Sequence, residues 1–160
     1  MNKILKLLKE NLSFIITVIV ISVIVNSLVM VNQVVGVSMY PTYNDGNLLF
    51  SSKIIEEIER GDIVAIHSDA LNEDIIKRVI AIPGDKVSYI NGILTLNDEI
   101  IFEEYINKEV INNEYQIDEI TVSENSYIVM GDNRNNSTDS RHFGLVHNDN
   151  IFGKILFKIR

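Results

Sequence analysis

A lysine inside an otherwise apolar segment is the first residue that could do chemistry. Asp74-Ile75-Ile76-Lys77-Arg78-Val79-Ile80-Ala81-Ile82-Pro83-Gly84-Asp85 holds two adjacent cations among aliphatic side chains. Strand periodicity puts alternate residues on one face, which groups Ile75, Lys77, Val79 and Ala81 apart from Ile76, Arg78, Ile80 and Ile82. Arginine stays protonated in proteins, whereas a desolvated lysine can lose its proton. If either cation is a base it is Lys77; alternatively, each pairs with a carboxylate or extends into solvent.

A candidate nucleophile lies upstream, in Gly36-Val37-Ser38-Met39-Tyr40-Pro41-Thr42. The hydroxyl of Ser38 is a weak nucleophile unless a base beside it accepts its proton. A lysine with its ordinary pKa of about 10.4 is almost fully protonated at neutral pH. We therefore expect burial to lower the pKa of Lys77 if the two residues work together. Taken alone, the segment favours a juxtamembrane linker in which Pro41 ends a helix.

A third segment, residues 131–144 (GDNRNNSTDSRHFG), is densely polar. It could be a solvated loop. A calcium loop starting at Asp132 is excluded, because the third, sixth and twelfth positions are Arg134, Ser137 and Phe143. A Ser–His–Asp triad using His142 and Asp139 is a further alternative, since triads are recognised by geometry rather than by order.

Composition narrows the function classes. The formal net charge of −8 makes nucleic acid a poor partner, because phosphate binding needs a basic face. Without cysteine there is no disulfide framework or thiolate nucleophile. The three histidines are not closely paired in sequence, which argues against a histidine-rich metal site, and we expect neither metal nor organic cofactor.

An apolar stretch precedes the segment that carries Ser38 and must position it. No charged residue occurs between Asn11 and Asn44, and residues 13–31 read SFIITVIVISVIVNSLVMV. A bilayer core of about 30 Å needs roughly 20 helical residues, which predicts a transmembrane anchor over residues 12–32. Lysines in residues 1–11 predict a cytoplasmic tail, with residues 33–160 outside the cell membrane as a single-pass protein's extracytoplasmic domain. A buried core helix would rarely be this long without a charged face, and no Ala-x-Ala site follows as in a cleaved secretory signal.

Short segments rich in Val, Ile, Tyr and Phe make the outer domain mainly β. The predicted strands are Asn47–Ser52, Asp62–His67, Asp74–Ile82, Lys86–Ile90, Ile93–Leu96, Ile117–Val122, Ser126–Met130 and Ile151–Ile159. Asn91-Gly92 and Pro83-Gly84 predict tight turns. Lys53–Arg60 could form one or two helical turns, and Glu99–Glu114 has no clear pattern.

The apolar segment followed by GVSMYPT, KRVIAIPGD and GDNRNNSTDSRHFG resembles the ordered motif set of bacterial type I signal peptidases, in their compact Gram-positive form. The resemblance extends from the anchor to Phe143. It implies a signal-peptidase-like coiled β-sheet or barrel domain behind one N-terminal transmembrane helix. It also implies a membrane-bound serine endopeptidase that removes signal peptides from exported preproteins through an acyl-enzyme.

By this resemblance Ser38 matches the nucleophile and Lys77 the general base. Ser137 matches a serine whose hydroxyl helps to orient the lysine. Four further positions match supporting residues: Asp139 and Arg141, which hold the site, and Asp132 and Arg78, which can brace one another.

The resemblance also implies a substrate site for preproteins with small residues before the cut, next to the lipid bilayer. Its residues would be Val34, Gly36, Met39, Ile75 and Ile76. Some family members carry a serine at the position of Gly36 that helps to hold the oxyanion, so here only the backbone N–H of Ser38 is assigned to that task. Two other interpretations stay open: a self-cleaving Ser–Lys peptidase of the repressor type, and a non-catalytic anchored β module in which Ser38 and Lys77 lie apart.

Overall fold

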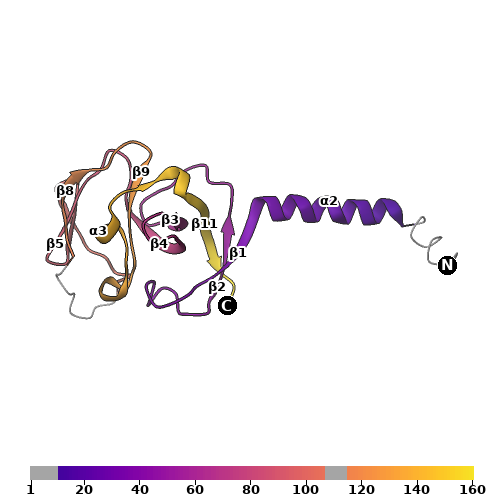
Figure 1. The fold of residues 1–160 in the computed structure, drawn as a ribbon, viewed down its shortest axis with the longest axis horizontal. Helices are drawn as coiled ribbons and strands as arrows, with labels where there is room; N and C mark the ends of the chain where they lie inside the picture. The colour runs from indigo at the N-terminus through magenta and orange to yellow at the C-terminus, as the bar shows by residue number, and fades with distance from the viewer. Residues whose placement is uncertain (1–10, 107–114) are drawn as a thin grey trace.

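The strands of the described residues form two antiparallel sheets (Figure 1). The computed structural model describes residues 11–106 and 115–160. The larger sheet has the order β1-β2-β11-β3-β4-β9-β10 and the smaller one β7-β6-β5-β8. The strands are β1 (Val29–Gln33), β2 (Leu48–Ser52), β3 (Ile63–Ser68), β4 (Glu73–Ala81), β5 (Lys86–Ile90), β6 (Ile93–Leu96), β7 (Glu99–Ile101), β8 (Ile117–Thr121), β9 (Ser126–Met130), β10 (Val146–His147) and β11 (Ile151–Lys158). The mainly β class predicted from the sequence is confirmed, although the strand pairing among the described residues leaves β1 and β10 as edges rather than closing a barrel.

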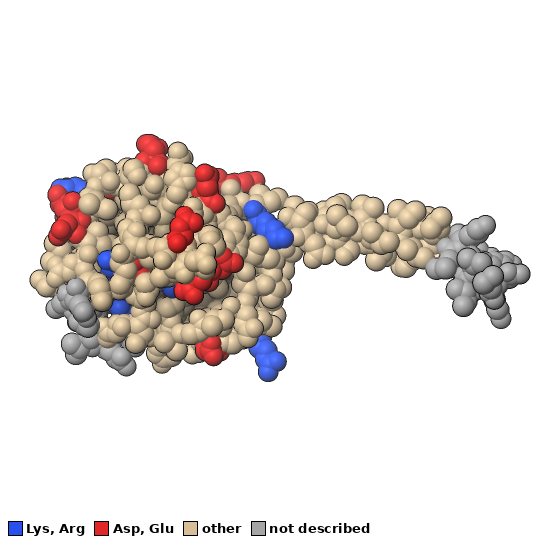
Figure 2. All heavy atoms as spheres, in the orientation of Figure 1, with Lys and Arg blue, Asp and Glu red and all other residues tan. Residues whose placement is uncertain are grey.

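Helix α2 (Leu12–Leu28) projects from the end of the body opposite the smaller sheet (Figure 1). It has no buried residue, and its surface carries no acidic or basic side chain, whereas acidic residues are scattered over the β body (Figure 2). Within residues 11–106 and 115–160, no helix reaches the length and apolarity that crossing a membrane requires.

The apolar run changes conformation before the predicted end of the anchor at residue 32. The helix ends at Leu28, and Val29–Gln33 form β1, which pairs with β2 from Val29↔Ser52 to Gln33↔Leu48. In β1 the backbone N–H and C=O groups pair with those of β2. From the apolar sequence alone, these groups were expected to pair within a helix. The last residues of the predicted anchor therefore belong to the sheet.

Both predicted tight turns are present. Asn91 and Gly92 have φ values of 53° and 78°, as a two-residue hairpin turn between β5 and β6 requires. The N–H of Asp85 donates to the carbonyl of Ile82 at 3.1 Å, closing the turn around Pro83 and Gly84. These turns fix the register of the smaller sheet and redirect the chain after β4.

A β-bulge modifies the predicted alternation along β4. The register against β9 shifts between Val79 and Ala81. Ala81 consequently packs with Ile80 between β4 and the smaller sheet, while Ile82 packs with Val79 in another core cluster. The predicted faces therefore hold from Ile75 to Val79, and the assignment of Ala81 and Ile82 was wrong because a bulge shifts alternation by one residue.

The segment Lys53–Arg60 contains no helix, contrary to the prediction. Ile58 is buried in the core, and local side chains bind the backbone instead of a helical ladder. The Ser52 hydroxyl exchanges hydrogen bonds with the backbone of Ile54, and the Asp62 carboxylate accepts from the N–H of Glu59. Such contacts compete with helix formation.

Candidate active site

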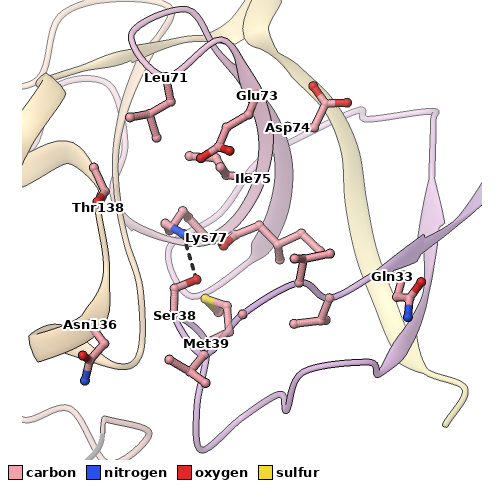
Figure 3. Close-up of a pocket in the computed structure, with 15 residues that line it drawn as sticks. Gln33, Ser38, Met39, Leu71, Glu73, Asp74, Ile75, Lys77, Asn136 and Thr138 are labelled. Atoms are coloured by element: carbon pink, nitrogen blue, oxygen red, sulfur yellow. Dashed lines mark hydrogen bonds between the residues drawn. The ribbon is translucent and has the colours of Figure 1, made fainter.

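Strand β4 and the segment after β1 bring Ser38 and Lys77 together, although 39 positions separate them in sequence. Lys77 Nζ lies 3.0 Å from Ser38 Oγ, as Figure 3 shows, and also 3.2 Å from the carbonyl oxygen of Ile76. This distance is within hydrogen-bond reach, as a nucleophile and its base require. The non-catalytic module, which would have separated the two residues, does not fit this geometry.

Lys77 is buried, with 3% of its surface exposed. Burial lowers its pKa below the ordinary lysine value. The carboxylates of Asp139 and Glu73 oppose this shift, and the guanidinium of Arg141 adds to it. Desolvation dominates, so the site favours the neutral amine that a general base needs.

Replacing Lys77 with methionine should stabilise the protein at neutral pH. Because the folded-state pKa of Lys77 is lowered, the unfolded chain binds more protons below about pH 10.4, and unfolding is favoured there. The advantage of Lys77→Met should shrink as pH rises toward that value, by up to about 1.4 kcal/mol per pH unit. Urea unfolding of both proteins at several pH values measures it.

Lys158→Met makes the same substitution at an exposed lysine and is the matched control. Parallel pH dependences for the parent and Lys77→Met would mean that Lys77 titrates as an ordinary lysine.

The segment that carries Ser38 is held by the 131–144 loop. The backbone N–H of Asn133 donates to the carbonyl of Ser38 at 3.0 Å, and its side-chain amide donates to the carbonyl of Val37 at 3.1 Å. On the other side, the N–H of Gly36 donates to Asp45 Oδ1 at 2.7 Å. These bonds fix the backbone on both sides of the nucleophile.

Two arginine–carboxylate pairs with fully buried carboxylates support this arrangement. Arg78 donates from Nε and Nη2 to the two oxygens of Asp132, at 2.8 and 2.7 Å, and Thr42 donates to the same carboxylate. Arg141 likewise donates from Nε and Nη2 to Asp139, at 2.8 and 2.9 Å. Such bidentate pairs fix geometry as well as charge.

Asp139 joins the second pair to the backbone around the site. Its carboxylate accepts from the N–H of Gly131 at 2.9 Å and caps helix α3 (Ser140–Phe143) by accepting from the N–H of Arg141. Burial raises the pKa of Asp139, but the hydrogen bonds from Arg141 and Gly131 and the charge of Arg141 outweigh this and hold it below the usual range. Asp139 therefore stays ionised.

Ser137 lies at this site but makes no hydrogen bond to Lys77. Its hydroxyl is buried, and it has no hydrogen-bond partner among the described residues. It packs instead against Gly131, where a Cβ would collide with it.

His142 occupies a different setting from a triad histidine. Its Nδ1 accepts from the backbone N–H of Asp139 at 3.3 Å, and its ring lies 4.0 Å from that of Tyr115. The Asp139 carboxylate is committed to Arg141 and Gly131. The structure gives no Ser–His–Asp constellation in the part of the chain that it describes.

A cavity of about 310 Å³ opens beside the dyad (Figure 3). Its walls come from residues 33–39 on one side and residues 73–77 on the other, with Leu71, Asn136 and Thr138 completing the rim. The lining includes Ser38, Lys77 and the five residues predicted to receive substrate: Val34, Gly36, Met39, Ile75 and Ile76. An extended peptide in this cavity would run between β4 and the segment that follows β1, and would reach the dyad.

Sequence reasoning missed several residues that hold the site. Asn133 and Gly131 lie inside the polar 131–144 loop, and Thr42 inside the first segment, but nothing in their spacing distinguished them. Glu103, which forms a buried ion pair with Arg134, lies in a segment that had no clear pattern. Only tertiary structure joins these residues.

The chain is similar to known proteins of one family. The family model for signal peptidase, peptidase S26, matches residues 7–159. Signal peptidase I of Bacillus caldolyticus is 38% identical over 137 residues, covering 77% of this chain and 75% of its own. Signal peptidase IB of Staphylococcus aureus is 34% identical over 172 aligned positions, covering 94% of this chain and 90% of its own.

A solved structure is also similar. The crystal structure of a signal peptidase I from Enterococcus faecalis matches with a TM-score of 0.54 and 32% sequence identity. The match covers 65% of this chain and all of the other one.

Proposed function

Since this chain belongs to the signal peptidase family, peptidase S26, and is a serine peptidase of the signal peptidase I type, we propose that it uses Ser38 and Lys77 as a catalytic dyad. The observation that carries the proposal is the 3.0 Å separation of Lys77 Nζ and Ser38 Oγ, with the lysine buried. The family's activity is removal of signal peptides, so the substrates are exported preproteins. We also propose that these preproteins carry small residues directly before the cleaved bond.

Acylation starts with neutral Lys77. Its Nζ takes the hydroxyl proton of Ser38 as Oγ attacks the scissile carbonyl carbon. The oxyanion that forms is held by the backbone N–H of Ser38, which makes no hydrogen bond to any residue in the described ranges. When the C–N bond breaks, protonated Lys77 returns its proton to the leaving amine, which becomes the N-terminus of the mature protein.

Deacylation repeats the same proton transfers with water. The signal peptide is now joined to Ser38 Oγ as an ester. Lys77 Nζ takes a proton from a water molecule, which attacks the ester carbonyl, and the proton then returns to Ser38 Oγ as the ester bond breaks. The signal peptide leaves with a carboxyl terminus, and Ser38 and Lys77 are regenerated.

The extended peptide would bind by β-addition between residues 34–36 and residues 75–76. Both segments line the cavity beside Ser38, which supports this binding mode. Met39 and Ile76 pack in one apolar cluster at this wall, which supports binding of small apolar side chains near the cut. Larger side chains would have to displace buried core atoms.

Anchoring in the cell membrane is the second part of the proposal, with the helical part of the predicted anchor, Leu12–Leu28, in the bilayer and the N-terminal tail in the cytoplasm. In support, α2 exposes its apolar side chains and has none buried. The adjoining body continues this surface with exposed apolar residues on β1, on the segment after it and at the end of β11: Val31, Val35, Val37, Tyr40, Leu156, Phe157 and Ile159. A bilayer in contact with these exposed apolar residues would hold the enzyme and its substrate at the same membrane surface, close to Ser38.

The test is incubation of the detergent-solubilised protein with a preprotein that carries an Ala-x-Ala site, beside Ser38→Ala. We expect the parent to cut after the second alanine, which N-terminal sequencing of the product establishes, and Ser38→Ala to be inactive but folded. Cleavage that survives in Ser38→Ala would move the nucleophile elsewhere. Absence of cleavage by the folded parent across several preproteins would refute the proposed activity.

A further inference from the structure

A buried ion pair joins the smaller sheet to the 131–144 loop. Glu103 follows β7, and its carboxylate oxygens lie 2.6 and 2.5 Å from Nη1 and Nη2 of Arg134. Both side chains are almost fully buried, at 3% and 1% exposure. Arg134 Nε also donates to the carbonyl of Gly131 at 3.1 Å, so the pair fixes the start of the loop.

Tyr105 forms a second connection two residues further on. Its ring lies under the guanidinium of Arg78, 4.0 Å from ring centroid to Cζ, and its hydroxyl donates to Glu103 Oε1 at 2.5 Å. Burial, followed by the negative charge of Glu103, raises the pKa of the Tyr105 hydroxyl. Tyr105 therefore remains a hydrogen-bond donor at working pH. A cation over an aromatic face contributes most when both groups are desolvated.

These contacts lead to both members of the dyad. Arg78 is the neighbour of Lys77 on β4, and it holds Asp132 through two hydrogen bonds. Asp132 is followed by Asn133, whose N–H binds the carbonyl of Ser38. Tyr105 thus contacts Arg78, the neighbour of Lys77 on β4. Through Glu103 and Arg134 it is also connected to the 131–144 loop, which binds the backbone of Ser38.

We propose that Glu103 and Tyr105 are positioning residues for the reaction, through which the smaller sheet sets the distance between Lys77 and Ser38. The proposal rests on the proposed function of the dyad. Neither residue lines the cavity, so they act on the reaction through Arg78 and Arg134 rather than by touching substrate. Without them the buried guanidinium of Arg134 and the partly buried guanidinium of Arg78 lose partners, and Arg78 can turn away from Asp132.

The test variant is Tyr105→Leu, which removes the ring and the hydroxyl but keeps an apolar side chain. We expect kcat to fall on the order of tenfold, with KM nearly unchanged, because small displacements of reacting groups are expensive in rate. Tyr105→Phe keeps the ring over Arg78 and should recover most of the rate. Leu94→Ala is the matched control: Leu94 is buried in the smaller sheet and packs in its core cluster.

Leu94→Ala should lower the melting temperature as Tyr105→Leu does, while kcat measured well below both melting temperatures stays at the parental value. Equal losses of kcat in the two variants, or no loss in folded Tyr105→Leu, would overturn the proposal, since either result makes Tyr105 a purely structural residue.

A second readout does not depend on peptidase activity. The charged groups that face Lys77 are Glu73 on its own strand and Asp139 and Arg141 from the loop side, and none of them is changed by Tyr105→Leu. Loosening Arg78 would free Asp132 and, through Asn133, the backbone of Ser38, which contacts Lys77. Water should then reach Lys77, so its NMR titration should move to higher pH in Tyr105→Leu, and again in Glu103→Gln. An unchanged titration in both folded variants would contradict the proposal even if the parent cleaved no preprotein, which keeps its failure distinct from failure of the proposed activity.

Discussion

Lys77→Met should lower kcat/KM for a preprotein by about 10²- to 10⁴-fold, the usual contribution of a positioned general base. The side chain of methionine fills similar space, so the loss would come from the missing amine rather than from a cavity. Lys77→Arg should lose as much activity, because a guanidinium stays protonated and cannot accept the proton of Ser38. Single-turnover cleavage assays on the folded variants measure both losses.

The double variant Ser38→Ala/Lys77→Met supplies the control. Residues that act as one unit have non-additive effects, so it should be no slower than the slower single variant. Substantial activity in Lys77→Arg would show that the site needs a positive charge rather than a proton acceptor, and the proposed mechanism would be wrong.

Gly131→Ala should be the most damaging small substitution in the 131–144 loop. A Cβ at this position would lie 2.5 Å from the carbonyl oxygen of Ser38 and would also collide with the hydroxyl of Ser137. The Ser38 oxygen belongs to the backbone and is held by Asn133, so relief requires movement of the nucleophile itself. A misplacement of about 1 Å can cost roughly 10²-fold in rate, and overpacking costs about 1–3 kcal/mol of stability. Cleavage kinetics and urea unfolding measure the two effects.

Gly153→Ala is the matched control. A Cβ there meets Ser51, Ala65 and Met30 at 3.5–3.6 Å, which is ordinary van der Waals contact. We expect near-parental activity and stability for Gly153→Ala. If Gly131→Ala matched it, the close approach of the 131–144 loop to Ser38 would not constrain the reaction.

The parts of the fold that follow from local pattern were predictable from sequence. Lys86–Ile90, Ile93–Leu96 and Ser126–Met130 form strands with the predicted bounds, because alternation and an Asn-Gly turn specify them locally. β1 could not be predicted, since its residues continue an apolar run and become a strand only by pairing with β2. The bulge in β4 likewise depends on its pairing with β9.

Some features of the candidate site could likewise be predicted from the sequence, and others could not. The amine of Lys77 among aliphatic residues could be identified as a candidate base by its chemistry, whereas Ser38 was assigned as its nucleophile by the resemblance to type I signal peptidases. Their 3.0 Å separation was not predictable, because it depends on the 131–144 loop holding the backbone of residues 37–38. Glu103 and Tyr105 were not predicted because each contacts an arginine that is distant in sequence.

The most direct test of the central claim is an NMR titration of Lys77 in the folded, detergent-solubilised protein, with Lys77→Arg used to assign its signal. The mechanism predicts a pKa below the ordinary lysine value, because burial disfavours the charged amine, and it predicts that kcat/KM rises with pH through the same pKa. A signal that titrates as an exposed lysine does, near pH 10.4, would contradict it, because Lys77 would then be protonated when Ser38 must lose its proton.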